Sequence, residues 1–97
     1  MVTYMLLMKL TDLGLKEIKN SPQRIDEGIK TFEKIGGKVI GFYAAAGEYD
    51  FVSLGEAPND EAAITFALGL SAQGYVKTTS VKLFGVNQFK DMIKKFS

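Results

Sequence analysis

Gly47-Glu48-Tyr49-Asp50 lies between two segments with the composition of β-strands, residues 39–46 and 51–55. Because so few residues separate them, the two segments are predicted to pair as a β-hairpin with this tetrapeptide at its tip. We expect Gly47 to adopt a positive φ that a side chain would disfavour. We also expect Asp50 to bond neighbouring main-chain amides and so fix the turn.

A strand and a helix are expected before the hairpin. Residues 2–10 are rich in apolar and aromatic side chains, which is typical of a strand. Ser21-Pro22 fits a helix N-cap followed by proline at the first helical position. Gly36-Gly37 fits the C-terminal end of that helix.

A helix, a strand and a last helix are expected after the hairpin. Asn59 follows Pro58 and fits the N-cap of a helix that Gly74 ends. Residues 75–84 are rich in β-branched side chains and predict the fourth strand. Asn87 is expected to cap a C-terminal helix with an apolar stripe. The stripe comprises Phe89, Met92, Ile93 and Phe96.

The first six elements follow the order βαββαβ, which is the split βαβ arrangement of the ferredoxin-like plait. Right-handed crossovers place both long helices on one face of a four-stranded antiparallel sheet. The sequence therefore predicts an α+β fold with an extra C-terminal helix, formed as a single domain over residues 1–97.

The second face of this sheet is expected to be covered by another copy of the chain. The first two strands carry apolar side chains on both faces, whereas a half-solvated sheet alternates between apolar and polar residues. A two-fold dimer buries such a patch against itself. The alternative is that the C-terminal helix folds back, but it is short enough to cover one edge at most. The candidate dimer-interface residues are Tyr4, Leu6, Met8, Ile40 and Phe42.

The composition narrows the chemistry further. The 97 residues include no cysteine and no histidine, which excludes disulfides, thiolate chemistry and the Ser-His-Asp triad. The net charge of +1 gives no electrostatic reason to expect nucleic acid or an anionic membrane as a partner. We expect a cytoplasmic protein with no metal and no cofactor.

The hairpin tip has two interpretations. Glu48, Tyr49 and Asp50 are ordinary turn-forming residues, and a structural role follows from that alone. Alternatively they line a cleft at the sheet edge, where two close carboxylates act as acid or base and bind a ligand. Alternation along a strand would let Glu48 and Asp50 converge while Tyr49 diverges from them.

Two further residues are candidate ligand contacts. Arg24, on the first long helix, can clamp an anion or form a surface ion pair with Glu17 or Glu27. Tyr43, in the second strand, fits a core or interface position as well as a ligand contact.

Several short motifs together resemble the GYD domain family of bacterial and archaeal proteins, over roughly residues 2–90. They are Thr11-Asp12, Lys19-Asn20-Ser21-Pro22, Gly36-Gly37-Lys38, Gly47-Glu48-Tyr49-Asp50 and Glu56-Ala57-Pro58-Asn59-Asp60. The resemblance implies a dimeric α+β barrel of ferredoxin-like subunits. It implies no established activity and hence no catalytic residues.

The hairpin is also similar to one in the effector-binding domain of leucine-responsive regulators, which bind small effectors between subunits. This chain lacks their helix-turn-helix half, so DNA binding is not implied. Dimeric α+β barrels further include cofactor-free monooxygenases and small isomerases, several of which use histidine. These likenesses concern the fold, and fold alone does not determine function.

Three hypotheses follow. The first is a non-catalytic dimeric module that binds a small molecule or another protein at the subunit interface. The second is a small cofactor-free enzyme with Asp50 or Glu48 as base and Tyr49 or Tyr43 as orienting acid. The third is a purely structural oligomer. A cavity that reaches Asp50 would favour the enzyme.

Overall fold

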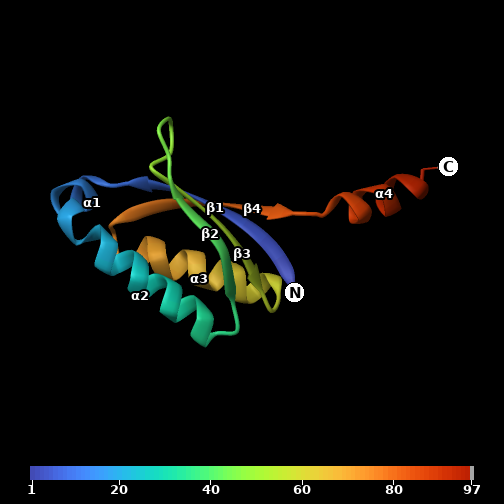
Figure 1. Ribbon diagram of the computed structural model, residues 1–97, viewed down its shortest axis with the longest axis horizontal. Coiled ribbons are helices and arrows are strands. Elements are labelled where there is room, and N and C mark those ends of the chain that lie inside the picture. The colour runs from blue at the N-terminus through green and yellow to red at the C-terminus, as the bar shows by residue number, and fades with distance from the viewer. Residues whose placement is uncertain (97) are drawn as a thin grey trace.

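The computed structural model describes residues 1–96, which form four strands and four α-helices (Figure 1). In chain order the elements are β1 (Val2–Leu10), α1 (Asp12–Lys16), a 3-10 helix (Ile18–Asn20), α2 (Ser21–Lys34), β2 (Lys38–Ala44), β3 (Phe51–Ala57), α3 (Asp60–Ala72), β4 (Val76–Leu83) and α4 (Val86–Lys94).

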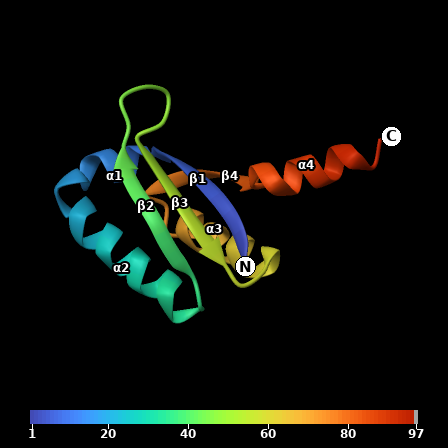
Figure 2. The same cartoon turned by 45° about the vertical axis from the view of Figure 1, so that its right-hand side comes forward.

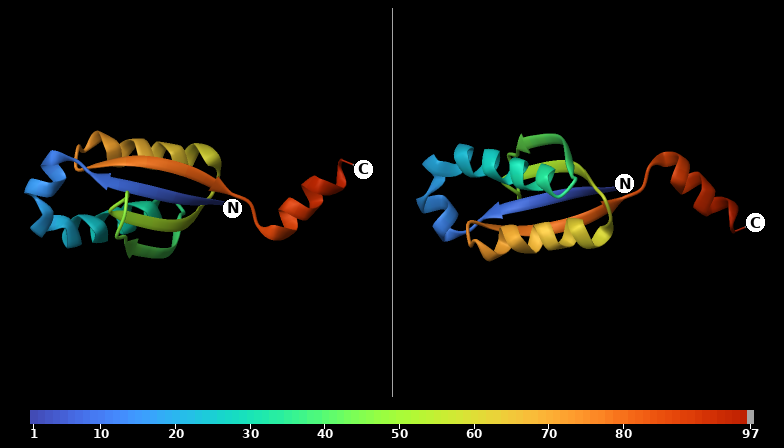
Figure 3. Two further views of the ribbon diagram at one scale, coloured as in Figure 1. Left: turned by 90° about the horizontal axis from the view of Figure 1, so that it is seen from above. Right: turned by 90° about the horizontal axis from the view of Figure 1, so that it is seen from below.

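The strands form one antiparallel sheet in the order β2-β3-β1-β4. Helices α2 and α3 lie on the same face of this sheet, and strands are visible between them when the molecule is seen from below (Figure 3). The predicted ferredoxin-like α+β architecture is confirmed.

The helix ends follow mostly from the expected residues. The side-chain oxygen of Asn59 accepts a hydrogen bond from the Ala62 amide at 2.8 Å, which makes Asn59 the N-cap of α3. Gly36 and Gly74 have φ angles of 90° and 86° just beyond α2 and α3. Such angles favour glycine, so both helices end where the sequence predicted.

Two capping predictions were wrong. Ser21 is the first residue of α2, and the N-cap position before it belongs to Asn20. The last helix begins one residue before Asn87, with Gly85 at the N-cap position. The Gly85 amide donates to the side-chain oxygen of Gln88 at 2.8 Å, so a side chain inside the helix satisfies this end.

The tip of the β2–β3 hairpin rises above the sheet (Figures 1 and 2). Positive φ angles occur only at Gly36 and Gly74 among the described residues, so the positive φ expected at Gly47 was wrong. A Cβ atom built at Gly47 meets no other atom within 4 Å. Gly47 therefore makes no conformational or steric demand for glycine in this structure.

Replacing Gly47 by alanine is expected to leave stability unchanged or to raise it by up to about 1 kcal/mol. The reason is that alanine restricts the unfolded chain, while the folded tip has room for its methyl group. Urea denaturation of Gly47→Ala beside the wild type measures the difference. A loss of more than about 1 kcal/mol would contradict the observed backbone at the tip.

The sheet face that packs against α2 and α3 carries the even-numbered residues of β1. Tyr4, Leu6, Met8 and Phe42 line the space between the sheet and these helices. Their assignment to a face-to-face dimer interface was therefore wrong, because α2 and α3 already cover that face. Ile40 is outside this layer and is half exposed.

The opposite face of the sheet is uncovered and largely apolar. The odd-numbered β1 residues Met5 and Leu7 lie on it, and strand register places partners from the other strands beside them. The apolar residues of this open face include Met5, Leu7, Tyr43, Val52, Val81 and Leu83. None of the six side chains is fully buried, and Tyr43 is 60% exposed.

Helix α4 extends away from the sheet and covers neither edge (Figures 1, 2 and 3). The alternative that it folds back is not observed. Its apolar stripe is therefore exposed along its length. The exposed members are Val86, Phe89, Met92, Ile93 and Phe96.

Candidate functional site

A cavity of about 130 Å³ lies between the sheet and helices α2 and α3. Aromatic side chains line much of it. The aromatic members are Tyr4, Phe32, Phe42, Phe51, Phe66 and Tyr75. Phe32 and Phe66, from α2 and α3, have ring centroids 4.9 Å apart, and Phe42 and Phe51, from β2 and β3, have centroids 5.6 Å apart.

The cavity is left unfilled because several residues that face the space between the sheet and the two helices have small side chains or none. Gly28 of α2, Ala63 of α3, and Ser53 and Gly55 of β3 all line it. A Cβ atom built at Gly28 meets only Leu70, at 4.0 Å. The cavity is partly open rather than a sealed void in a packed core, so a small molecule could enter it.

Polar groups lie at the end of the cavity where α2 begins. Ser21 is only 9% exposed, and its hydroxyl has no hydrogen-bond partner within the described residues. Arg24 lies one turn further along and donates from Nη2 to the main-chain oxygen of Glu17 at 2.6 Å. Its guanidinium carbon is 3.9 Å from the ring centroid of Tyr75, a cation–π contact.

The carboxylate of Asp50 is used structurally. It accepts a hydrogen bond from the amide of Leu10 at 2.8 Å, and the Asp50 amide donates to the oxygen of Met8 at 2.9 Å. The Asp50 oxygen also accepts from Ala45 at 2.8 Å. Asp50 thus joins the hairpin to the end of β1, forty residues away in sequence, rather than bonding only its neighbours in the turn.

The structure does not bring the candidate ligand residues together. Of the five candidate ligand residues, Arg24 alone lines the cavity. Arg24 donates to the main-chain oxygen of Glu17 rather than forming the expected surface ion pair with a carboxylate. Tyr43 is on the open face, Glu48 is exposed in the loop, and Tyr49 is half-buried outside the cavity. Asp50 does not line the cavity, so the enzyme hypothesis lacks the geometry it needs.

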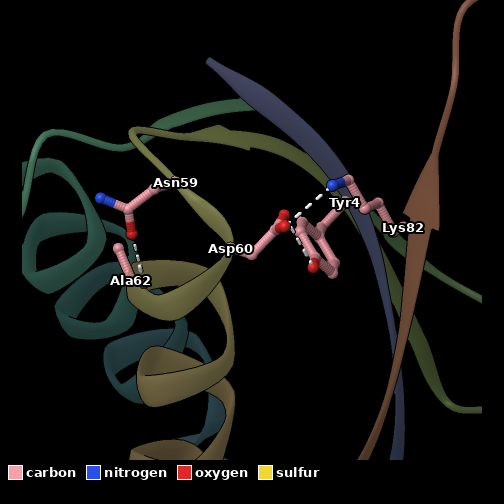
Figure 4. Close-up of polar contacts among 5 residues, drawn as sticks. All are labelled: Tyr4, Asn59, Asp60, Ala62 and Lys82. Atoms are coloured by element: carbon pink, nitrogen blue, oxygen red, sulfur yellow. Dashed lines mark hydrogen bonds and ion pairs between the residues drawn. The ribbon is translucent and has the colours of Figure 1, made fainter.

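A polar cluster that the sequence did not suggest lies at one end of the helix-covered face. Tyr4 donates from its hydroxyl to Asp60 at 3.1 Å, and the Lys82 ammonium donates to the other Asp60 oxygen at 2.9 Å (Figure 4). Tyr4 and Lys82 are direct partners in the β1–β4 register. Asp60 comes from the first turn of α3, so the cluster joins that helix to the sheet.

The three groups shift each other's titration. The hydrogen bond from Lys82 is the main cause that lowers the pKa of Asp60. The same bond is the main cause that raises the pKa of Lys82. Partial burial, followed by the bond to Asp60, raises the pKa of Tyr4. Charged partners that favour each other's ionised forms are typical of a structural ion pair.

Replacing Lys82 by methionine is expected to raise the pKa of Asp60, because its main stabilising donor is removed. The pKa of Asp60 is lower in the folded chain than in the unfolded chain. The stability that this difference provides is fully present at pH above the unfolded-state pKa, and it is lost as the pH falls through the folded-state pKa. Lys82→Met should therefore show a smaller loss of stability on acidification. Carboxyl-carbon NMR titration measures the pKa. Lys77→Met, which removes a lysine from the same strand, is the control and should leave Asp60 unchanged.

The GYD domain family model matches residues 4–93. The chain belongs to the GYD domain family. A protein with 34% identity to this chain over 87 residues is named the glutamine synthetase and cystathionine beta-lyase binding protein of Thermus thermophilus. The match covers 89% of this chain and 92% of that protein.

Two solved structures are similar to this GYD domain. MtbAldR has a TM-score of 0.65 and 23% identity, and the match covers 87% of this chain and 53% of that one. The leucine response regulatory protein LrpA of Mycobacterium tuberculosis has a TM-score of 0.57 and 19% identity, with 87% and 51% covered. The domain thus spans about half the length of these structures. They support the fold and say nothing of a ligand.

No helix within residues 1–96 is both long and apolar enough to cross a membrane.

Proposed function

We propose that this GYD domain is a non-catalytic protein-binding module that acts as a homodimer. The observation that carries the proposal is the uncovered apolar face of the sheet, together with the exposed stripe of α4. Large apolar surfaces of this kind mark interaction sites in soluble proteins. The two surfaces have different shapes, and we assign them different occupants.

The open face fits a second copy of the chain, because a two-fold axis buries its apolar centre against the same residues of the partner and brings the Glu56 of one copy near the lysines of the other. Lys9 and Lys77 are partners in register at one end of the face. Glu56 lies at the opposite end, beside Lys38. A two-fold axis running across the strands places the lysine pair of one copy over the Glu56 end of the other. The apolar residues between them then pack against their own equivalents.

Helix α4 fits a groove on another protein. It presents Phe89, Met92 and Ile93 at i, i+3 and i+4, with Phe96 exposed just beyond its end, and no sheet lies beneath it. Amphipathic helices dock into grooves through such a stripe. In a dimer, two of these helices act together, and simultaneous binding to an oligomeric partner increases the overall affinity.

The name of the Thermus relative supports enzymes as partners, since that protein is named for binding glutamine synthetase and cystathionine beta-lyase. We propose the corresponding enzymes of the organism that encodes this chain as the first partners to test. The domain would then attach to a metabolic enzyme rather than catalyse a step itself.

The experiment is calorimetric titration of each purified enzyme with the wild-type domain and with two paired variants. Phe89→Ser with Ile93→Ser removes apolar contacts from the α4 stripe, while Lys90→Ser with Lys95→Ser changes residues outside it. We expect a dissociation constant of about micromolar or tighter for one enzyme, weakened at least about tenfold by the first pair only. Absence of binding to both enzymes, or equal binding by both pairs, would contradict the proposal.

A further inference from the structure

We propose that the cavity between the sheet and helices α2 and α3 is a binding site for a small aromatic carboxylate. It is distinct from the open face and from α4, which lie on other sides of the molecule. Its size, its aromatic lining and the position of its polar groups each restrict the ligand.

The size and lining fit one aromatic ring. An enclosed apolar cavity of about 150 Å³ accepts benzene. This cavity measures about 130 Å³ but is partly open, and at Arg24, Gln73 and Tyr75 it adjoins a second pocket at the surface, so a ring fits inside while a short chain extends towards that end. The lining is mostly apolar, and the two phenylalanine pairs come from both sides of the layer. Aromatic rings pack well in tilted or offset contact with such side chains.

The charges of the lining select an anion. Arg24 is the only charged side chain among the lining residues of the described chain, and no carboxylate lines the cavity. Inside the cavity an amine would therefore meet a cation, while a carboxylate would meet a guanidinium; the Glu27 carboxylate lines the adjoining surface pocket rather than this cavity. For the same reason, the cavity is unsuited to a free amino acid, whose ammonium group would be left without a partner.

The donors are already in position at one end. Ser21 and Arg24 are three residues apart on α2, so they share one face of its first turn. The Ser21 hydroxyl is buried and has no partner, and the Arg24 guanidinium is held by Glu17 and Tyr75 with further N–H groups to donate. A carboxylate between them would complete the bonding of Ser21, while its ring extends towards the phenylalanines.

The experiment is calorimetric titration of the full chain with three probes of one shape. 3-Phenylpropionate, 3-phenylpropan-1-ol and 3-phenylpropylamine differ only in the head group. We expect the carboxylate to bind at least about tenfold more tightly than the alcohol, since a hydrogen bond to a charged group is worth more than a neutral one. The amine should bind weakest. Equal or tighter binding of the amine, or no binding of the carboxylate at millimolar concentration, would overturn the proposal.

Filling the cavity provides a matched pair of variants. Gly28→Leu places a side chain into the cavity, whereas Gly69→Leu places the same side chain on α3, where a Cβ atom meets nothing within 4 Å and the residue is not part of the lining. Both changes favour helix formation. Gly28→Leu should reduce the affinity for 3-phenylpropionate at least about tenfold, and Gly69→Leu should leave it unchanged. Undiminished binding by folded Gly28→Leu would show that the probe binds elsewhere.

Two polar variants test the head-group site even if Gly28→Leu does not fold. Ser21→Ala should unfold at the same or a higher urea concentration, because it removes a buried hydroxyl that has no partner among the described residues. The same variant should bind 3-phenylpropionate more weakly. Arg24→Met should bring the affinities of the carboxylate and the alcohol together. A constant ratio of the two affinities in both variants would overturn the assigned orientation.

Discussion

Replacing Asp50 by alanine is expected to lower the free energy of unfolding by about 2 kcal/mol. The change leaves the half-buried amide of Leu10 without its acceptor, and such a loss costs about 1–3 kcal/mol. The main-chain bonds of residue 50 to Met8 and Ala45 are retained, so the hairpin still forms. Urea denaturation at one fixed chain concentration measures the loss, because the stability of the proposed dimer would depend on concentration.

Asp50→Asn is the matched control. Asparagine has nearly the same shape and keeps a side-chain oxygen that can accept from Leu10, so it should recover most of the stability. Equal stability of the alanine variant and the wild type would show that this bond does not hold the hairpin to β1. Asp50→Ala and Gly47→Ala together distinguish the contributions of the two motif residues to stability. The first substitution should lower the free energy of unfolding, and the second should not.

Replacing Val52 by lysine is expected to weaken self-association by more than about a hundredfold, which corresponds to about 3 kcal/mol. Register places Val52 between Leu7 and Tyr43 on the open face. In the proposed dimer a lysine there would be buried without a partner, and the two-fold axis would introduce it twice. Sedimentation equilibrium over a range of concentrations measures the dissociation constant.

Ile64→Lys is the control for that variant. Ile64 is an exposed apolar residue of α3, on the helical side of the molecule. The same substitution there should leave the association unchanged, because the open face is not affected. A dimer that tolerated lysine at position 52 would use another surface, and the assignment of the open face would then be wrong.

The order of the elements could be predicted because local signals agreed along most of the chain. Asn59, Gly36 and Gly74 each fit one backbone role, and the structure shows each in that role. The C-terminal helix lacked such a residue: Asn87 is a good capping type, but Gln88 satisfies the helix from within. Competing caps one residue apart are equally compatible with the pattern.

The face of each strand could not be predicted as well. β1 has apolar residues at both even and odd positions, so its period of two does not reveal which face the helices cover. The pattern of β4 points to the wrong face, because its polar residues lie on the face that the helices cover. These residues are Thr78, Ser80 and Lys82, which pair with even-numbered residues of β1. A polar strand face usually indicates solvent, but here part of it borders a cavity.

The candidate site depended on contacts that no local pattern encodes. Asp50 bonds Leu10, and Asp60 bonds both Tyr4 and Lys82, each across many residues of sequence. The cavity arises from small residues on separate elements, such as Gly28 and Ala63, whose common position only the packed layers define. Ser21 was interpreted as a cap, and the structure instead leaves its buried hydroxyl without a partner.

The mass of the wild-type chain in solution tests the central claim most directly. Light scattering at micromolar concentration should give twice the chain mass of 10.6 kDa, because the open sheet face is proposed to pack against a second copy. A mass of one chain under these conditions would contradict the homodimer. The apolar face would then have to be covered by something other than this chain.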